Sequence, residues 1–185
     1  MTYEPRPLPK EVQRICTELD APIRLVAHLT LVHDVAVDLV AGLRQKFPGL
    51  EFDDAAVCFG AASHDIGKAL ERNRNELLGP GRQHEVDGPA LLEEHGVEPR
   101  LVRFAKTHGR WSESDEDLLI EDLLVALCDC VWKGQRLDAL EKKVIEKIAQ
   151  QTGVEEWEAF SEIDCLLGEI SSQADERLAY QGRMG

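Results

Sequence analysis

The sequence has little of what a membrane-spanning, secreted or nucleic-acid-binding protein requires. It contains no unbroken apolar run of about 18 residues, so we expect no helix that spans a membrane. Residues 1–7 lack the apolar core of a secretory signal. Basic residues are outnumbered, with 21 Lys and Arg against 35 Asp and Glu and a formal net charge of −14. This acidity argues against bulk nucleic-acid binding and against docking on an anionic membrane.

Cysteines are few and odd in number, and their positions indicate the redox environment of the protein. Five are present, most of them inside apolar segments, where they are typical of reduced, small hydrophobic side chains in a cytoplasmic protein. Cys128 and Cys130 flank Asp129 but have no second cysteine pair that would complete a thiolate zinc site. We therefore expect a cytoplasmic protein without a zinc site of this kind.

Strand-like alternation is almost absent as well, whereas helical spacing of apolar residues recurs along the chain. The sequence has neither an internal repeat nor a low-complexity tract. Its 185 residues suffice for one well-packed core and are short for two. The pattern predicts an all-α, single-domain protein.

Proline and glycine mark the ends of the expected helices. A short helix is expected over residues 11–19, and Pro22 opens a longer one that Pro48-Gly49 ends. Asp53 is the expected N-cap of the helix that leads into His64. Further helices are expected from Gly88-Pro89 to His95-Gly96, from Pro99 to His108-Gly109, and over 118–132, 137–150 and 154–179.

An imidazole and a carboxylate stand side by side at the end of an apolar segment, in His64-Asp65-Ile66-Gly67-Lys68. Burying both is costly unless something offsets their desolvation. A divalent metal does so directly, since both groups are metal ligands. Taken alone, the pair is also typical of an ordinary helix end with a solvated aspartate. Gly67 would end the helix, which would let Lys68 reach back over a metal toward an anionic substrate.

Asp129 is a lone carboxylate within the apolar segment 123–132. Its burial is unfavourable unless it is paired with a cation or bound to a metal. A salt bridge to Lys133, Arg136 or a helix terminus would satisfy it as well as a metal would.

Together these residues resemble the HD-domain superfamily of metal-dependent phosphohydrolases. Its members have an all-helical core and an ordered pattern of His, His-Asp and a distant Asp, which here would be His28, His64-Asp65 and Asp129. A subset that binds two metals has two more histidines in between, and His84 and His108 occupy that interval. The resemblance covers roughly residues 25–136. It implies an HD-type helical bundle over 21–136, after a lead with a short helix over 1–20.

The remaining residues, 137–185, are expected to form additional C-terminal helices. Their amphipathic spacing allows them either to pack on the core or to form a homodimer.

Two histidines compete for the first position of the pattern. They are five residues apart, about 140° around a helix, so both cannot face one centre. The resemblance favours His28, and His33 would then be a partly exposed helix histidine. His95 lies in the last turn before Gly96, where a favourable interaction with the helix dipole accounts for a histidine.

The resemblance implies two divalent ions, drawn from Mn, Fe, Co, Ni, Mg and Zn and bridged by Asp65. One ion would be held by His28, His64 and Asp129, and the other by His84 and His108. A hydroxide between them would attack the phosphorus of a small anionic substrate, a phosphate monoester or diester such as a nucleotide. Lys68 is the candidate for holding a phosphate oxygen; weaker candidates are Arg110, Lys133 and Arg136.

Two other functions share this ligand pattern. Some HD-fold proteins hold two irons and oxidise a small substrate, and imidazole and carboxylate suit iron as well as manganese or cobalt. A degenerate site that only senses a nucleotide is the third reading, which the full set of expected ligand types disfavours.

Overall fold

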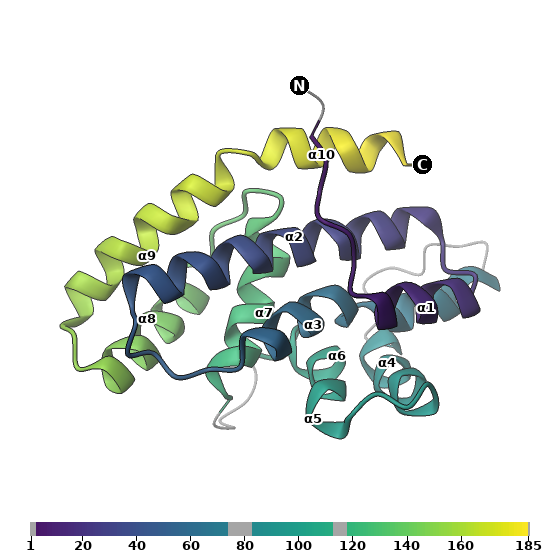
Figure 1. The fold of residues 1–185 in the computed structure, drawn as a ribbon, viewed down its shortest axis with the longest axis horizontal. Helices are drawn as coiled ribbons and strands as arrows, with labels where there is room; N and C mark the ends of the chain where they lie inside the picture. Colours follow the sequence, from purple (N-terminus) through teal and green to yellow (C-terminus); the bar gives the residue numbers. More distant parts are fainter. Residues whose placement is uncertain (1–2, 74–82, 113–117, 185) are drawn as a thin grey trace.

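The computed structural model describes residues 3–73, 83–112 and 118–184. Over these residues it is helical and contains no strand, so the predicted all-α class is confirmed (Figure 1). The elements are α1 (Lys10–Glu18), α2 (Ile23–Lys46), α3 (Asp54–Ser63), the 3-10 helix η1 (Ile66–Asn73), α4 (Gln83–Glu94), α5 (Pro99–Val102), α6 (Phe104–Thr107), α7 (Ile120–Val131), α8 (Asp138–Thr152), α9 (Glu156–Ser171) and α10 (Ala174–Arg183).

Helix α2 is the longest element and runs across the molecule in Figure 1. It packs against α3, α7, α9 and α10, and its buried side chains include Leu31, Val35 and Leu39. By length and composition α2 is apolar enough to cross a membrane, which the absence of an unbroken apolar run did not lead us to expect. However, 61% of its most apolar 18-residue window is buried inside the molecule, as in the core helix of a soluble protein.

Two groups of buried side chains form the hydrophobic core. The larger joins α2, α3 and α7 to the inner faces of α8 and α9, and the smaller joins α1, the start of α2 and η1 to residues of the α4–α6 region. The lead before α1 is fixed to α2 through Asp34, which accepts hydrogen bonds from the Tyr3 hydroxyl and, at 3.0 Å, from the Arg6 backbone N–H. The C-terminal helices thus cover the core.

The predicted helix start at Gly88-Pro89 is wrong, because α4 already begins at Gln83 and carries Pro89 in its interior. Tertiary packing explains the difference. The backbone of α4 lies so close to η1 that a Cβ on Gly67 would stand 2.2 Å from the His84 carbonyl oxygen. Leu91 and Leu92 are buried in the same helix. These contacts outweigh the local preference of proline for a helix start.

Two other predicted helices are each divided in two. The segment from Pro99 to His108 forms α5 and α6, with a break at Arg103. The final helix divides into α9 and α10 at Ser172 and Gln173. At this second break the buried guanidinium of Arg177 donates a hydrogen bond to the Ile170 carbonyl. Apolar spacing continues across the break, so the sequence pattern alone does not reveal it.

Candidate metal centre

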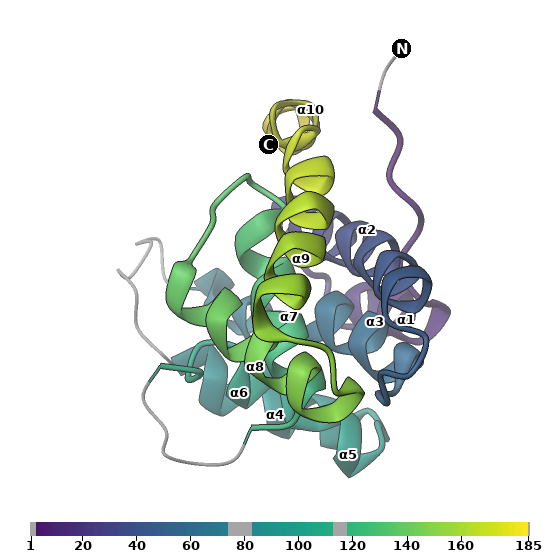
Figure 2. The same ribbon diagram turned by 90° about the vertical axis from the view of Figure 1, so that its left-hand side faces the viewer.

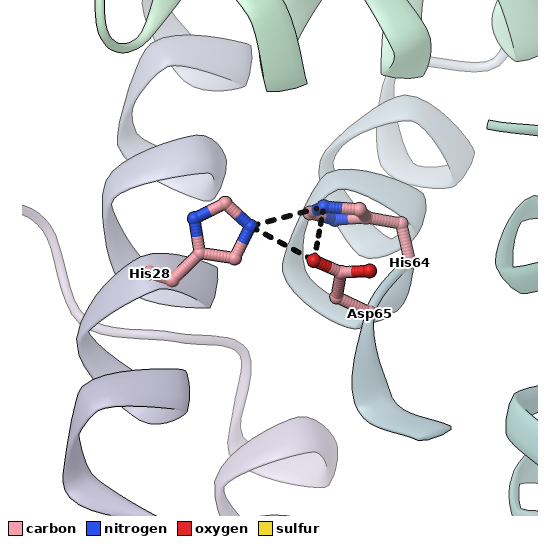
Figure 3. Close-up of side chains that lie close together, drawn as sticks. All are labelled: His28, His64 and Asp65. Atoms are coloured by element: carbon pink, nitrogen blue, oxygen red, sulfur yellow. Dashed lines mark hydrogen bonds and ion pairs between the residues drawn. The ribbon is translucent and has the colours of Figure 1, made fainter. Parts of the chain in front are cut away.

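Six side chains from five parts of the chain converge in the interior. His28 comes from α2, His64 from the C-cap of α3, and Asp65 from the turn that follows. The other three are His84 in the first turn of α4, His108 at the C-cap of α6 and Asp129 near the end of α7. Figure 3 shows His28, His64 and Asp65 pointing toward one another from neighbouring elements. All six residues that were predicted as metal ligands therefore lie in this cluster.

A side-chain cap and close-packed backbones bring these elements together. Asp53 caps α3 as predicted, because its carboxylate accepts a hydrogen bond of 2.9 Å from the Ala56 N–H. Gly60 lets α3 approach its neighbours, since a Cβ there would lie 2.6 Å from the Phe104 ring and 2.8 Å from Val125. Real Cβ atoms do not tolerate such distances, so a larger residue at Gly60 would push α3 away from α6 and α7.

One side of the cluster is built on a single oxygen of Asp65. Oδ2 lies 3.2 Å from His28 Nε2 and 3.6 Å from His64 Nε2. The two Nε2 atoms are 3.3 Å apart, and Asp129 Oδ1 lies 3.4 Å from each of them. His28, His64 and Asp65 offer ligand atoms close enough together to share one ion.

The other side is built on the second oxygen of the same carboxylate. Asp65 Oδ1 lies 3.3 Å from His84 Nε2 and 3.5 Å from His108 Nε2. These three residues also offer ligand atoms close enough for one ion. Asp65 therefore stands between two groups of imidazole nitrogens and presents a different oxygen to each.

Backbone contacts determine which nitrogen of two histidines faces the cluster. His64 Nδ1 lies 2.9 Å from the Ala61 carbonyl oxygen, and His108 Nδ1 lies 3.2 Å from that of Phe104. A carbonyl can only accept a hydrogen bond, so Nδ1 carries the proton in both rings. In the neutral ring Nε2 then has a free lone pair, which is the form of imidazole that binds a metal.

The electrostatics of the cluster suit metal binding. His64 and Asp65 are almost fully buried. Burial alone would raise the pKa of Asp65, but the surrounding His64, His108, His28 and Lys68 hold that pKa well below its usual range. The pKa of Asp129 is lowered in the same way by His64 and His28, against the effect of burial. Both carboxylates are thus ionised.

The pKa values of two histidines are shifted in the opposite direction, upward. Burial opposes the charged form of His28, yet hydrogen bonds to Asp129 and Asp65 outweigh it and raise its pKa to about 9. Burial also opposes charge on His108, whose pKa is nevertheless raised by Asp65 and Asp129.

A divalent ion fits the residues that are present. Asp65 Oδ1 is fully buried and accepts no hydrogen bond among the described residues, which is costly for an ionised oxygen. Neutral imidazole nitrogen and carboxylate oxygen are the usual ligands of zinc, iron, manganese, cobalt and nickel. Metal ligation would satisfy this oxygen and the facing Nε2 atoms together.

The predicted phosphate-binding cations lie in different surroundings. Lys68 Nζ contacts Asp65 Oδ2 at 2.5 Å, and its side chain is 42% exposed, so it lies at the rim of the cluster. Arg110 donates to buried Glu85 at 3.1 Å. Arg136 forms ion pairs with Glu141 and Asp164 instead of approaching Asp129. Lys133 is exposed.

Two histidines lie outside the cluster. His33 does not reach it, but it is buried at 8% exposure, so the expectation of a partly exposed side chain is wrong. Its Nδ1 has no hydrogen-bond partner among the described residues, and burial lowers its pKa. Helical spacing alone does not indicate this burial, which depends on how α2 packs in the fold. His95 bonds to the Leu91 carbonyl oxygen at 2.8 Å in the last turn of α4, as expected for a helix-end histidine.

Several supporting residues were not anticipated. The Trp132 ring packs edge-on against His28, with ring centroids 5.2 Å apart. Arg177 Nη1 donates to the Trp132 carbonyl oxygen at 2.9 Å. Buried Asp122 accepts a 2.8 Å hydrogen bond from Thr107, next to His108. The sequence hints at a supporting role only for Glu85, which is next to His84, and for Thr107, which is next to His108. It gives no such hint for Arg177.

Comparison with known proteins agrees with this geometry. The sequence profile of the HD domain family matches residues 11–131. The chain therefore belongs to the HD-domain family, whose members are typically metal-dependent phosphohydrolases. No curated protein and no solved structure gives a significant match.

Proposed function

We propose that this protein is a metal-dependent phosphohydrolase that cleaves a phosphate monoester or diester of a small molecule, such as a nucleotide, in the cytoplasm. The observation that carries the proposal is the position of the Asp65 carboxylate, whose Oδ2 faces His28 and His64 while its Oδ1 faces His84 and His108. A carboxylate between two imidazole groups is the arrangement that a binuclear metal site needs.

In this proposal the residues on each side of Asp65 would hold one ion, with the Asp65 carboxylate available to both. His28, His64 and Asp129 would serve one ion, and His84 and His108 the other. When bound, such ions lower the pKa of a water molecule to give a nucleophile at neutral pH and offset the negative charge of the phosphoryl oxygens. The donor set suits Mn, Fe, Co, Ni or Zn more than Mg, which prefers oxygen ligands.

The protein's own residues contribute orientation and charge. Hydrogen bonds to the Ala61 and Phe104 carbonyls hold the His64 and His108 rings with Nε2 toward the cluster. Lys68 lies at the rim and is free to exchange its contact with Asp65 for a phosphate oxygen, to which an ammonium binds as a point charge. The burial of His64 and Asp65 keeps bulk water from the centre and strengthens these electrostatic contacts.

The acidity of the whole chain restricts the substrate. A net charge of −14 repels a long polyanion, whereas a small phosphate ester interacts mainly with the local cationic centre. A small, singly or doubly phosphorylated metabolite is therefore the substrate class that we propose.

The test is purification without added metal, elemental analysis, and a screen of phosphate esters with Mn, Ni, Co and Mg. We expect hydrolysis that depends on metal and that is abolished in His64→Ala and Asp65→Ala. His95→Gln is the matched control, because His95 lies outside the cluster, and should retain the parental rate. Parental turnover in the His64 or Asp65 variants would refute the proposal. Bound iron together with oxygen-dependent consumption of a substrate would assign the oxygenase chemistry instead.

A further inference from the structure

A second surface feature lies away from the metal centre, between α8 and α9, which face the viewer in Figure 2. It is a pocket of about 760 Å³ whose lining includes Ile145 of α8 and the aromatic side chains of Trp157 and Phe160. Trp157 is 68% exposed and Phe160 is 55% exposed. The metal-centre residues all precede residue 130, so this pocket belongs to a different part of the chain.

Most of the surface of these two aromatic side chains lies outside the core. They are three residues apart and so are neighbours on α9. Trp157 lies opposite the buried residues Ala159 and Leu166, and Phe160 lies at the edge of the buried face. The chain is only 5% aromatic, and Trp132 is buried, as is Phe104. Exposing a tryptophan and a phenylalanine together is unfavourable in water and is characteristic of a contact surface.

Carboxylates line the same pocket as the aromatic pair. Asp138, Glu155 and Glu156 line the pocket and are exposed. Lys142 is the cation in the lining, and Glu141 is already paired with Arg136 at 2.6 Å. The lining therefore combines apolar and aromatic side chains with exposed carboxylates. Lysine and arginine complement such carboxylates, and they also bind favourably over aromatic rings.

A second copy of the chain is a poor occupant. It carries the same net charge of −14, and a symmetric contact would bring the exposed carboxylates of both copies together. We infer that the pocket between α8 and α9 binds a partner protein through a segment in which Lys or Arg side chains flank an apolar side chain. The apolar side chain packs between Trp157 and Phe160, and the basic side chains contact Asp138, Glu155 and Glu156.

The position of the pocket gives it a role separate from hydrolysis. The HD family match ends at residue 131, before α8 begins at Asp138. The pocket thus lies on helices that this chain adds to the matched region. Its function as a docking surface does not depend on the chemistry proposed for the metal centre.

The test uses the full chain and a fluorescently labelled helical peptide of about 14 residues that carries leucines on one face and lysines on the other. The comparison peptide has serine in place of each leucine and the same charge. We expect the leucine peptide to bind about tenfold more tightly than the serine peptide by fluorescence anisotropy. We also expect a blue shift of tryptophan emission that is lost in Trp157→Phe.

Substitutions distinguish binding in the pocket from nonspecific attraction of a basic peptide to an acidic protein. Trp157→Ser with Phe160→Ser should weaken binding of the leucine peptide about tenfold, and Glu155→Gln with Glu156→Gln should weaken it less and reduce its salt dependence. Ile23→Ser is the matched control, because Ile23 is 63% exposed on α2, and it should have no effect. Circular dichroism checks that each variant is folded.

Equal binding of both peptides, or full binding by the double serine variant, would overturn the inference. A Trp157-dependent dimer in sedimentation experiments would also overturn it, because the surface would then be the homodimer interface that the C-terminal helices allow.

Discussion

The Arg177 side chain of α10 donates a hydrogen bond of 2.9 Å to the backbone carbonyl of Trp132, 45 residues earlier in the chain. Arg177 is 1% exposed, and a second hydrogen bond joins it to the Ile170 carbonyl. The Trp132 ring in turn packs against His28. A helix outside the HD family match therefore supports the position of a residue in the candidate metal centre.

Replacing Arg177 tests this connection. In Arg177→Met the two carbonyls lose their donor, so we expect the free energy of unfolding to fall by about 1–3 kcal/mol in urea titrations. We also expect the near-ultraviolet circular dichroism of the tryptophans to weaken, because Trp132 loses its fixed position. Arg183→Met on the same helix is the control, since Arg183 is exposed. Unchanged stability and spectrum in Arg177→Met would show that the contact is dispensable.

Metal stoichiometry distinguishes the two sides of the cluster. His84→Gln should retain one ion per chain, because it removes a ligand from one side only, and Asp65→Asn should lose both. Elemental analysis after dialysis measures this without reference to activity. His33→Gln is the control for a buried histidine on α2 that lies outside the cluster. Retention of two ions by Asp65→Asn would contradict the bridging role.

Gly67 is expected to be intolerant of any side chain. A Cβ there would stand 2.2 Å from the His84 carbonyl oxygen and 2.8 Å from the Gly88 nitrogen, so Gly67→Ala should displace α4. We expect a stability loss of about 1–3 kcal/mol and weaker binding of the ion held by His84. Gly168→Ala lies in α9 with open space around it and should stabilise the protein by about 0.5–1 kcal/mol. Equal effects of the two substitutions would show that the approach of η1 to α4 is adjustable.

The cap of α3 should give a pH-dependent contribution to stability. The Ala56 N–H and, against the effect of burial, Arg100 lower the pKa of Asp53 in the folded protein. A lowered pKa stabilises the fold above the unfolded value of about 4, and this contribution disappears as the pH falls through the folded value. Asp53→Ala should cost about 1 kcal/mol at neutral pH.

Asp53→Asn separates the cap from the charge, because asparagine still accepts the Ala56 hydrogen bond. The difference in unfolding free energy between the parent and Asp53→Asn should shrink as the pH falls below about 4. Chemical denaturation between neutral and acid pH measures it. A difference that grows toward low pH would have the wrong sign for this explanation.

Lys68 should affect substrate binding more than metal binding. If its ammonium holds a phosphate oxygen, Lys68→Met should raise KM about tenfold, which is the loss expected for one charge-assisted hydrogen bond. Metal content should stay at the parental level, because no ligand is removed. A loss of bound metal in Lys68→Met would indicate that the lysine acts through Asp65 instead.

The residues of the candidate site could be predicted from the sequence because the resemblance to the HD superfamily rests on their order along the chain. That order can be read without knowing how the helices pack. His64 and Asp65 at the end of an apolar segment, and Asp129 inside another, are conspicuous because burial of such groups needs compensation. The choice of His28 over His33 agrees with the cluster geometry. The all-α class followed from apolar spacing alone.

The features that were missed depend on long-range contacts. Local sequence favours a helix start at Pro89, but the contact between Gly67 and α4 extends the helix back to Gln83. His33 is buried, and the Arg177 side chain at the break between α9 and α10 is bonded to the Trp132 carbonyl as well as to that of Ile170. The contacts of Gly67 and of Arg177 with Trp132 join residues far apart in the chain, for which helical spacing and turn residues carry no signal.

The shared Asp65 carboxylate makes the two halves of the centre thermodynamically dependent. Each half has its own imidazoles, but both share the single negative charge of Asp65. The half with His28 and His64 has a further carboxylate, that of Asp129. An ion in one half would leave a weaker donor for the other, and linkage makes this penalty reciprocal. Loading would thus be ordered, with the Asp129 half filling at the lower metal concentration. Cellular metal supply would then decide what fraction of the protein holds both ions.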